Sequence, residues 1–167
     1  IIKVAEGYKL GVQAVNPNCD VYTAYTGSTE DVQKSKEAAQ AMIDRGVDLI
    51  GGGGNASNAG MIKACEEAGV YAFGELEQQN LAPETVIFCN MNNIENLVLQ
   101  AVKDTIDGDF QGCIREYGIA ADVAQLTEYN SHVPQEVKDK LAECMDQMRS
   151  GELDIPMITE ISDDIIH

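Results

Sequence analysis

Apolar and polar residues alternate along this chain with the spacings of both strands and helices. Short apolar runs typical of buried strands lie at 47–50, 70–73 and 86–89, and alternating β-branched and aromatic residues predict a strand over 20–25. A further strand is predicted over 113–117. Segments with apolar residues three and four apart lie between them and predict helices. Helices and strands that alternate along the chain indicate an α/β fold, with a Rossmann-like parallel sheet flanked by helices.

Capping residues and glycines set the limits of the predicted helices. A capping-box pattern begins one helix, proline begins another, and a glycine follows the end of each. After an opening helix, the predicted helices run from Ser28-Thr29-Glu30-Asp31 to Gly46, from Met61 to Gly69, from Asn92 (with Glu95 three residues on) to Gly108, and from Pro134 to Gly151.

The most unusual stretch is the glycine-rich run from Gly51 to Gly60, between a predicted strand and a predicted helix. Open α/β sheets bind ligands at the carboxyl ends of their strands, where this run lies. Glycines let the backbone approach a bound molecule, and a helix start offers unpaired N–H groups. The same pattern is also typical of a simple turn, so the residues alone leave both interpretations open.

Four loops are predicted at this carboxyl edge, over 25–28, 51–58, 75–79 and 90–93. They are rich in amide and carboxylate side chains that could bind hydroxyls or ring nitrogens, or could only solvate the edge of the sheet. The predicted ligand-binding residues are Gly51, Gly52, Gly53, Gly54, Asn55, Ser57, Asn58, Glu75, Gln78, Asn90 and Asn92.

Composition indicates one globular domain over residues 1–167 and excludes several classes of protein. Apolar residues make up 44% of the chain, and no apolar run approaches the roughly 20 residues of a membrane helix. Eleven Lys and Arg against 28 Asp and Glu give a formal net charge of −17, which disfavours nucleic-acid binding. Five cysteines without C-x-x-C spacing indicate no zinc or redox site, and most are expected to be buried.

Signatures of catalysis are few. No H-E-x-x-H, G-x-S-x-G or P-loop pattern occurs, and His132 and His167 lie in a polar turn and at the end of the chain. We therefore predict no catalytic residues, no metal ligands and no cofactor. Gly51, Gly53 and Ala56 fit G-x-G-x-x-A, which leaves a nucleotide-dependent enzyme as a lesser alternative.

Read end to end, the chain resembles the basic-membrane-protein family of ABC-transporter substrate-binding proteins, the purine-nucleoside-binding lipoproteins. The resemblance rests on an ordered set of segments rather than one motif. These are residues 7–11 (GYKLG), 14–17 (AVNP), 25–28 (YTGS), 43–50 (IDRGVDLI), 69–71 (GVY), 102–108 (VKDTIDG), 117–118 (YG), 129–130 (YN), 133–138 (VPQEVK) and 150–152 (SGE).

The resemblance implies one lobe of a type I periplasmic-binding-protein fold, in which two lobes close on a small solute and pass it to a membrane permease. Because the chain begins at Ile1 rather than Met, we expect an upstream part to be missing. The resemblance implies that the first, N-terminal lobe is the missing part and that residues 92–112 could pack on it. The implied location is extracytoplasmic, as a membrane-anchored lipoprotein or a periplasmic protein.

This chain departs from the family at positions that would bind a nucleoside. Gly51 and Gly52 stand where the family tends to place a stacking aromatic, Leu76 and Gln78 replace paired aspartates, and Asn92 replaces a lysine. A stacking aromatic is worth about 1–3 kcal/mol. The sequence therefore predicts uptake of a small polar solute, nucleoside-like or other. The alternative is the ligand-sensing domain of a transcriptional regulator or receptor.

Overall fold

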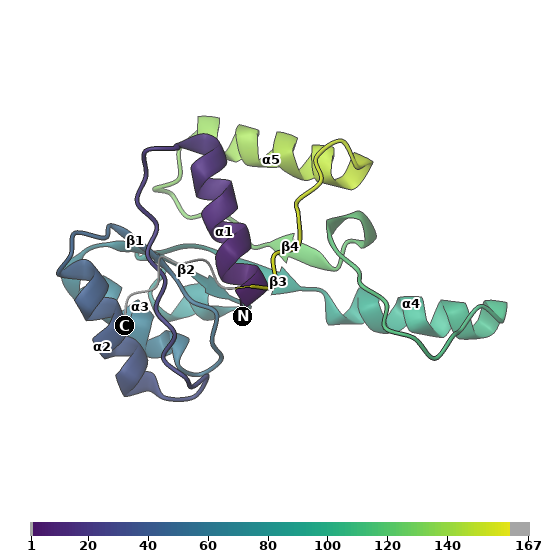
Figure 1. The fold of residues 1–167 in the computed structure, drawn as a ribbon, viewed down its shortest axis with the longest axis horizontal. Helices are drawn as coiled ribbons and strands as arrows, with labels where there is room; N and C mark the ends of the chain where they lie inside the picture. Colours follow the sequence, from purple (N-terminus) through teal and green to yellow (C-terminus); the bar gives the residue numbers. More distant parts are fainter. Residues whose placement is uncertain (1, 161–167) are drawn as a thin grey trace.

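The computed structural model describes residues 2–160 and has the predicted α/β architecture, with four strands in one sheet (Figure 1). Its helices and strands are α1 (Ile2–Val15), α2 (Val32–Ile43), β1 (Leu49–Gly51), α3 (Asn58–Ala68), β2 (Tyr71–Glu75), β3 (Val86–Asn92), α4 (Ile94–Asp107), β4 (Ala124–Leu126) and α5 (Gln135–Ser150), with two short 3₁₀ helices, η1 (Gln78–Leu81) and η2 (Ile119–Ala121).

The sheet has the strand order β1-β2-β3-β4 and is mixed rather than wholly parallel. β1 pairs with β2 and β2 with β3 in parallel, as predicted, and a register shift between Ala72 and Phe73 interrupts the second pairing. β4 pairs with β3 antiparallel, so the expectation of an all-parallel sheet is wrong at this edge. The sequence gives little sign of β4, because it has three residues and no fully buried side chain.

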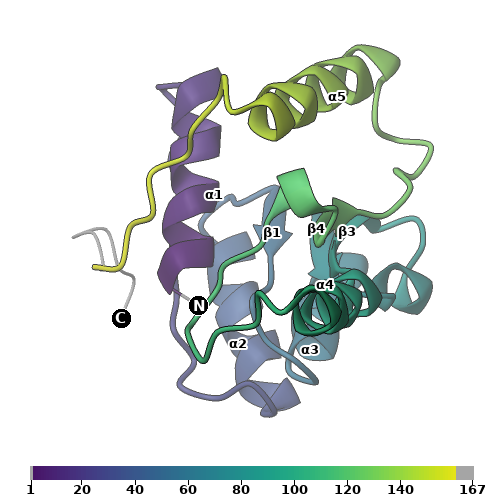
Figure 2. The same ribbon diagram turned by 90° about the vertical axis from the view of Figure 1, so that its right-hand side faces the viewer.

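Helices α2 and α3 lie together on one side of the sheet, whereas α5 lies on the other side of the molecule (Figure 2). The core lies between α3, α2 and the first three strands. Its buried residues are Ala39, Ile50, Met61, Ile62, Ala64, Cys65, Ala72, Ala82, Val86 and Cys89. Only Cys65 and Cys89 of the five cysteines are buried, so the prediction that most thiols are buried is wrong.

Helix limits follow the predicted signals closely at the C-terminal ends. Gly69, Gly108 and Gly151 each follow a helix in the left-handed conformation, which glycine adopts without steric cost. The N-terminal ends are displaced. Asp31 rather than Ser28 caps α2, and Asn93 rather than Asn92 caps α4, each by accepting a bond from the backbone N–H three residues on.

Two predicted strands are absent from the structure. Of residues 20–25, only Thr23 makes an isolated bridge, because the segment is separated from β1 by a cavity that both of them line. Residues 113–117 are irregular: the Arg115 guanidinium contacts the Asp104 carboxylate and donates to the Asp109 carbonyl at 2.8 Å, which holds this segment against α4. An alternating sequence forms a strand only where the edge of a neighbouring strand is within hydrogen-bonding distance.

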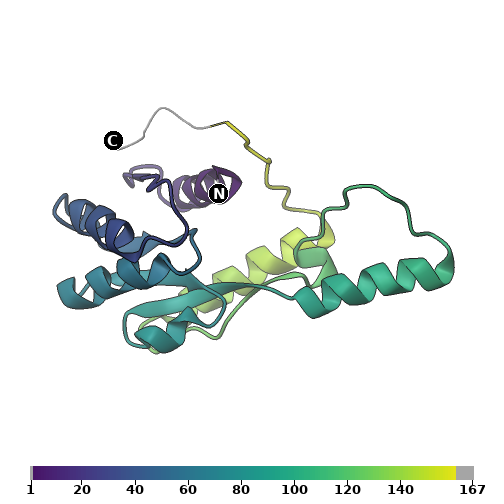
Figure 3. The same cartoon turned by 90° about the horizontal axis from the view of Figure 1, so that it is seen from below.

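Helix α4 projects away from the rest of the molecule (Figures 1 and 3). Its predicted apolar face is real but uncovered in this chain, with Ile94 and Val98 each 56% exposed and Ile106 78% exposed. An amphipathic helix normally buries such a face against another element.

Candidate functional site

Two of the predicted loops line a cavity that is larger than the one beneath α1. This cavity has a volume of about 1000 Å³ and is bounded by residues 24–29 on one side and by the glycine run on the other. α2 lines it through Ser35, Ala38, Ala39 and Met42. Of the predicted ligand-binding residues, those that line it are Gly51, Gly52, Gly53, Gly54, Ser57 and Asn58. The carboxyl edge of β1 therefore opens on a cavity, as the sequence predicts.

The glycines of this loop accommodate the protein's own side chains. A Cβ on Gly51 would overlap the ring of Phe73, and one on Gly52 would lie 2.7 Å from Asn58 Cγ. A Cβ on Gly54 would overlap Ser57 Oγ. At these three positions a glycine is required by internal packing, and the close approach of the backbone to a ligand stays a prediction.

Backbone N–H groups around the glycine run are also largely used within the protein. Gly54 N donates to Asn58 Oδ1 at 3.0 Å, and the amides of Asn55 and Ser57 donate to the Thr29 carbonyl at 3.2 and 3.0 Å. In the first turn of α3, the amides of Asn58, Ala59 and Gly60 bond to carbonyls three residues earlier. The helix start therefore offers fewer free donors than predicted, and the bonds to Thr29 join the two loops that bound the cavity.

Asn58 and Gln78 connect the glycine run to the end of β2. Asn58 is 2% exposed, and its Nδ2 donates to Gln78 Oε1 at 3.0 Å and to Glu75 Oε2 at 3.4 Å. Gln78 Oε1 accepts from the Glu75 amide at 3.0 Å, and its Nε2 donates to the Asn55 carbonyl at 3.2 Å. The structure thus brings four predicted residues together, in one hydrogen-bonded network rather than as separate ligand groups.

Asn90 and Asn92 belong to β3 itself rather than to the loop after it. Asn90 is the register partner of Glu75 on β2, and its carbonyl accepts from the Leu76 amide at 2.8 Å. Asn92 is exposed and pairs with Ala124 on β4. Neither residue lines the larger cavity, nor do Asn55, Glu75 and Gln78. Asn90 stays beside Glu75, whereas Asn92 lies farther along β3 towards α4.

A row of aromatic side chains crosses one face of the sheet. The Phe73 and Phe88 rings stack with centroids 5.5 Å apart, Tyr8 of α1 lies 4.9 Å from Phe73, and Tyr129 meets Phe88 edge-on at 6.0 Å. Tyr8 and Phe73 also line a second cavity of about 530 Å³ beneath α1. The sequence patterns do not reveal this row, although Phe73 and Phe88 both stand in predicted strands and are register partners.

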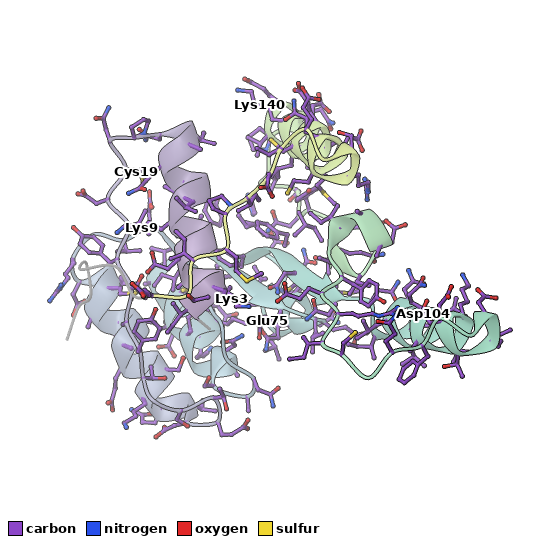
Figure 4. The ribbon with its side chains drawn as sticks, turned by 45° about the vertical axis from the view of Figure 1, so that its right-hand side comes forward. Lys3, Lys9, Cys19, Glu75, Asp104 and Lys140 are labelled. Atoms are coloured by element: carbon purple, nitrogen blue, oxygen red, sulfur yellow. The ribbon has the colours of Figure 1, made fainter. Side chains whose placement is uncertain are left out.

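Electrostatics single out Glu75 among the acidic residues of this edge. In Figure 4 it lies near the middle of the molecule, whereas Asp104 lies out on α4. Burial raises the pKa of Glu75 above its ordinary value of 4.5, and the hydrogen bond from Asn58 opposes this rise. Lys3 lines the larger cavity, and its Nζ lies 3.4 Å from the Glu116 carboxylate.

We expect Glu75→Gln to stabilise the chain at neutral pH. Because folding raises the pKa of Glu75, the stability it contributes is fully present below pH 4.5 and is lost as pH rises through the folded pKa. The melting temperature of Glu75→Gln should therefore exceed that of the wild type at pH 7 and approach it at pH 4. Glu77→Gln, at an exposed neighbour, is the control. A lower melting temperature for Glu75→Gln at pH 7 would contradict this account of the carboxyl group.

Groups that could support other chemistry are sparse in the part of the chain that the structure describes. Residues 2–160 contain no cluster of three or more His, Cys, Asp or Glu side chains placed to hold a metal ion. The His132 ring lies 3.0 Å from the Glu84 carboxylate, away from both cavities, and His167 lies outside the described residues. None of the helices within 2–160 has the length and apolar character needed to span a membrane.

Comparisons with known proteins find relatives that cover most of this chain. A purine-binding protein of Brucella abortus is 26% identical over 92% of this chain and 43% of its own length. The transcriptional activator protein med of Bacillus subtilis is 23% identical over 89% of this chain and 47% of its own length. A solute-binding protein of an ABC transporter system from Conexibacter woesei has the same fold, with a TM-score of 0.77 at 20% identity over 94% of this chain and 53% of that one.

The chain thus spans less than half the length of these two curated relatives. The sequence profile described as ABC transporter substrate-binding protein, PnrA-like, matches residues 1–159, nearly the whole chain. The chain therefore belongs to the PnrA-like family of ABC transporter substrate-binding proteins.

Proposed function

We propose that this chain is part of the solute-binding component of an ABC uptake transporter and contributes one wall of the solute site. The observation that carries the proposal is the meeting of residues 24–29 and the glycine run at a 1000 Å³ cavity, in a member of a substrate-binding family. A volume of this size suits a small solute. In this proposal no bond is made or broken, and a membrane permease receives the solute outside the cytoplasm.

The proposed solute is polar and either uncharged or cationic. Glu75 does not line the cavity itself. It is partly exposed and accepts a bond from Asn58, which does line the cavity, and a carboxylate accepts bonds from hydroxyl or ammonium groups. Lys3, the lysine that lines the cavity, already faces Glu116. A formal net charge of −17 further disfavours anions.

A thermal-shift series on the complete gene product tests this proposal. The solutes are adenosine, inosine, D-ribose, D-glucose and putrescine, and adenosine 5′-monophosphate is the anionic match to adenosine. We expect at least one uncharged or cationic member to raise the melting temperature, because a ligand stabilises only the state that binds it. The proposal fails if none does so at millimolar concentration, or if only the nucleotide does.

Two rival functions make different predictions. The similarity to a transcriptional activator supports a sensor that uses the same site for ligand detection. A DNA-binding segment elsewhere in the gene product would favour the sensor, and a lipobox would favour transport. A nucleotide-dependent enzyme requires NAD or NADP to raise the melting temperature, and no shift at saturating concentration would exclude that function.

The uncovered face of α4 is proposed to pack on a second lobe of the complete protein. Val98→Lys should change the stability of the present chain by only about 0.5 kcal/mol, because that side chain is 56% exposed. In the complete gene product it should cost about 2 kcal/mol, because the charge would be buried in an interface. Urea unfolding of both forms measures the difference.

Lys103→Ala, at an exposed position of the same helix, is the control for the α4 variant. Equal effects of Val98→Lys in the two forms would contradict packing of α4 on a second lobe.

A further inference from the structure

We infer that Asn58 and Gln78 are positioning residues whose amides orient the Glu75 carboxylate towards the solute, rather than groups that contact the solute themselves. The inference rests on the proposed function and assigns separate roles within its site. Four observations support it. The side-chain amides of Asn58 and Gln78 are already hydrogen-bonded, Glu75 is bonded through one carboxylate oxygen, the glycines pack around Asn58, and Asn58 is buried.

The Asn58 side chain has little bonding capacity left. Its Oδ1 accepts from Gly54 N at 3.0 Å, and its Nδ2 donates to Gln78 Oε1 and Glu75 Oε2. An Asn side chain has two N–H donors, and both are used by these two contacts. Because Asn58 is also 2% exposed, a solute cannot reach it without breaking the network.

Gln78 is hydrogen-bonded to Asn58, to Glu75 and to the backbone of Asn55. Its Oε1 accepts from both Asn58 Nδ2 and the Glu75 amide, and its Nε2 donates to the Asn55 carbonyl. The backbone and the carboxylate of Glu75 are thus both tied to these two amides. A side chain fixed at two points loses less conformational freedom when it binds a ligand.

Glu75 is the member of the network that keeps a free acceptor. Oε2 accepts from Asn58, whereas Oε1 has no hydrogen-bond partner among the described residues, and the side chain is partly exposed. The Asn58 bond also favours the ionised carboxylate, opposing the effect of burial on the pKa of Glu75. An oriented carboxylate whose second oxygen has no partner among the described residues suits a hydroxyl or ammonium donor.

The glycine run completes the arrangement by making room for Asn58. A Cβ on Gly52 would lie 2.7 Å from Asn58 Cγ, and one on Gly54 would lie 3.1 Å from Asn58 Oδ1. Real Cβ contacts are seldom this short, so residues larger than glycine would displace the Asn58 amide from Glu75. The glycine run therefore affects solute binding indirectly, because it encloses Asn58.

Asn58→Asp tests the positioning role. Aspartate can still accept from Gly54 N but cannot donate to Glu75, and it brings a second carboxylate close to the first. We expect the pKa of Glu75, followed by carboxyl carbon NMR in the complete gene product, to rise relative to the wild type. Asn55→Asp is the matched control, since Asn55 Nδ2 donates to Glu30 Oε1 at 3.2 Å instead.

The second readout is the affinity for the solute that gives the largest thermal shift among those named above, titrated by calorimetry from pH 5 to pH 8. Asn58→Asp should weaken binding about tenfold at pH 7, the loss of one charge-assisted hydrogen bond, and should move the acidic limb of the profile to higher pH. Gln78→Glu, which also places a carboxylate beside Asn58 and Glu75, should shift both readouts in the same direction if Asn58→Asp does not fold.

An unchanged Glu75 titration in Asn58→Asp would overturn the inference, as would a shifted titration with unchanged affinity. An equal shift of the Glu75 titration in Asn55→Asp would do so too. The failure of every solute to bind the wild type would instead contradict the proposed function, and the solute-reading role of Glu75 with it. The NMR titration needs no solute, so the two failures are distinguishable.

Discussion

Gly60→Ala is expected to destabilise the chain by about 2 kcal/mol, although alanine favours helices more than glycine does. Gly60 is buried in α3 where this helix crosses the start of α2. A Cβ there would overlap the Val32 carbonyl oxygen and would lie 2.9 Å from its carbon and 3.0 Å from Lys36 N. These are backbone atoms, so only a displacement of one helix relative to the other relieves the overlap.

Gly11→Ala supplies the matched control, because Gly11 is also helical and has nothing within 4 Å of its missing Cβ. It should stabilise the chain by about 0.5–1 kcal/mol, the difference in helix propensity. Urea unfolding of both variants gives the two values. Effects of the same sign and size would show that the contact of α2 with α3 is not as close as the structure has it.

Ile62→Ala should cost about 3 kcal/mol through lost burial and the cavity left behind. Ile62 is 2% exposed and packs in the cluster that joins α3 to α2 and the sheet. Since α3 begins at the glycine run, this loss should also loosen the loop that encloses Asn58.

The same substitution at an exposed site, Ile94→Ala, should change the free energy of unfolding by at most about 0.5 kcal/mol. Ile94 is 56% exposed at the start of α4. Equal losses at the two isoleucines would contradict the placement of the core between α3 and the sheet.

Elements with a strong local sequence signal could be predicted, whereas elements that depend on distant neighbours could not. Helix ends at Gly69, Gly108 and Gly151 are confirmed, because a left-handed residue after a helix is a backbone requirement that glycine meets by itself. Strand pairing depends on what lies alongside. Residues 20–25 have a strand-like sequence but line a cavity, whereas Ala124–Leu126 pair with β3 despite a weak pattern.

The sequence predicts the location of the candidate site better than it predicts the contacts within the site. The rule that ligand sites lie at the carboxyl ends of parallel strands predicts the place of the glycine run, which follows β1 and lines the larger cavity. Tyr25–Ser28 lines the same cavity although no strand of the described residues precedes it, so this rule does not explain its position. Hydrogen bonds between side chains cannot be read from spacing, so the sequence predicts Asn58 and Gln78 as ligand groups but does not reveal that they bond to each other. Phe73, whose ring fills the space beside Gly51, was missed because its partner is distant in sequence.

Mapping of backbone amide shifts in the complete gene product tests the central proposal most directly. On titration with the solute that raises the melting temperature most, we predict the largest shifts at Gly51–Gly54, Thr26–Ser28 and Glu75, with α5 unaffected. Shifts concentrated on α5 or on the outer end of α4, with the glycine run and Glu75 unmoved, would contradict a solute site at the carboxyl edge of the sheet.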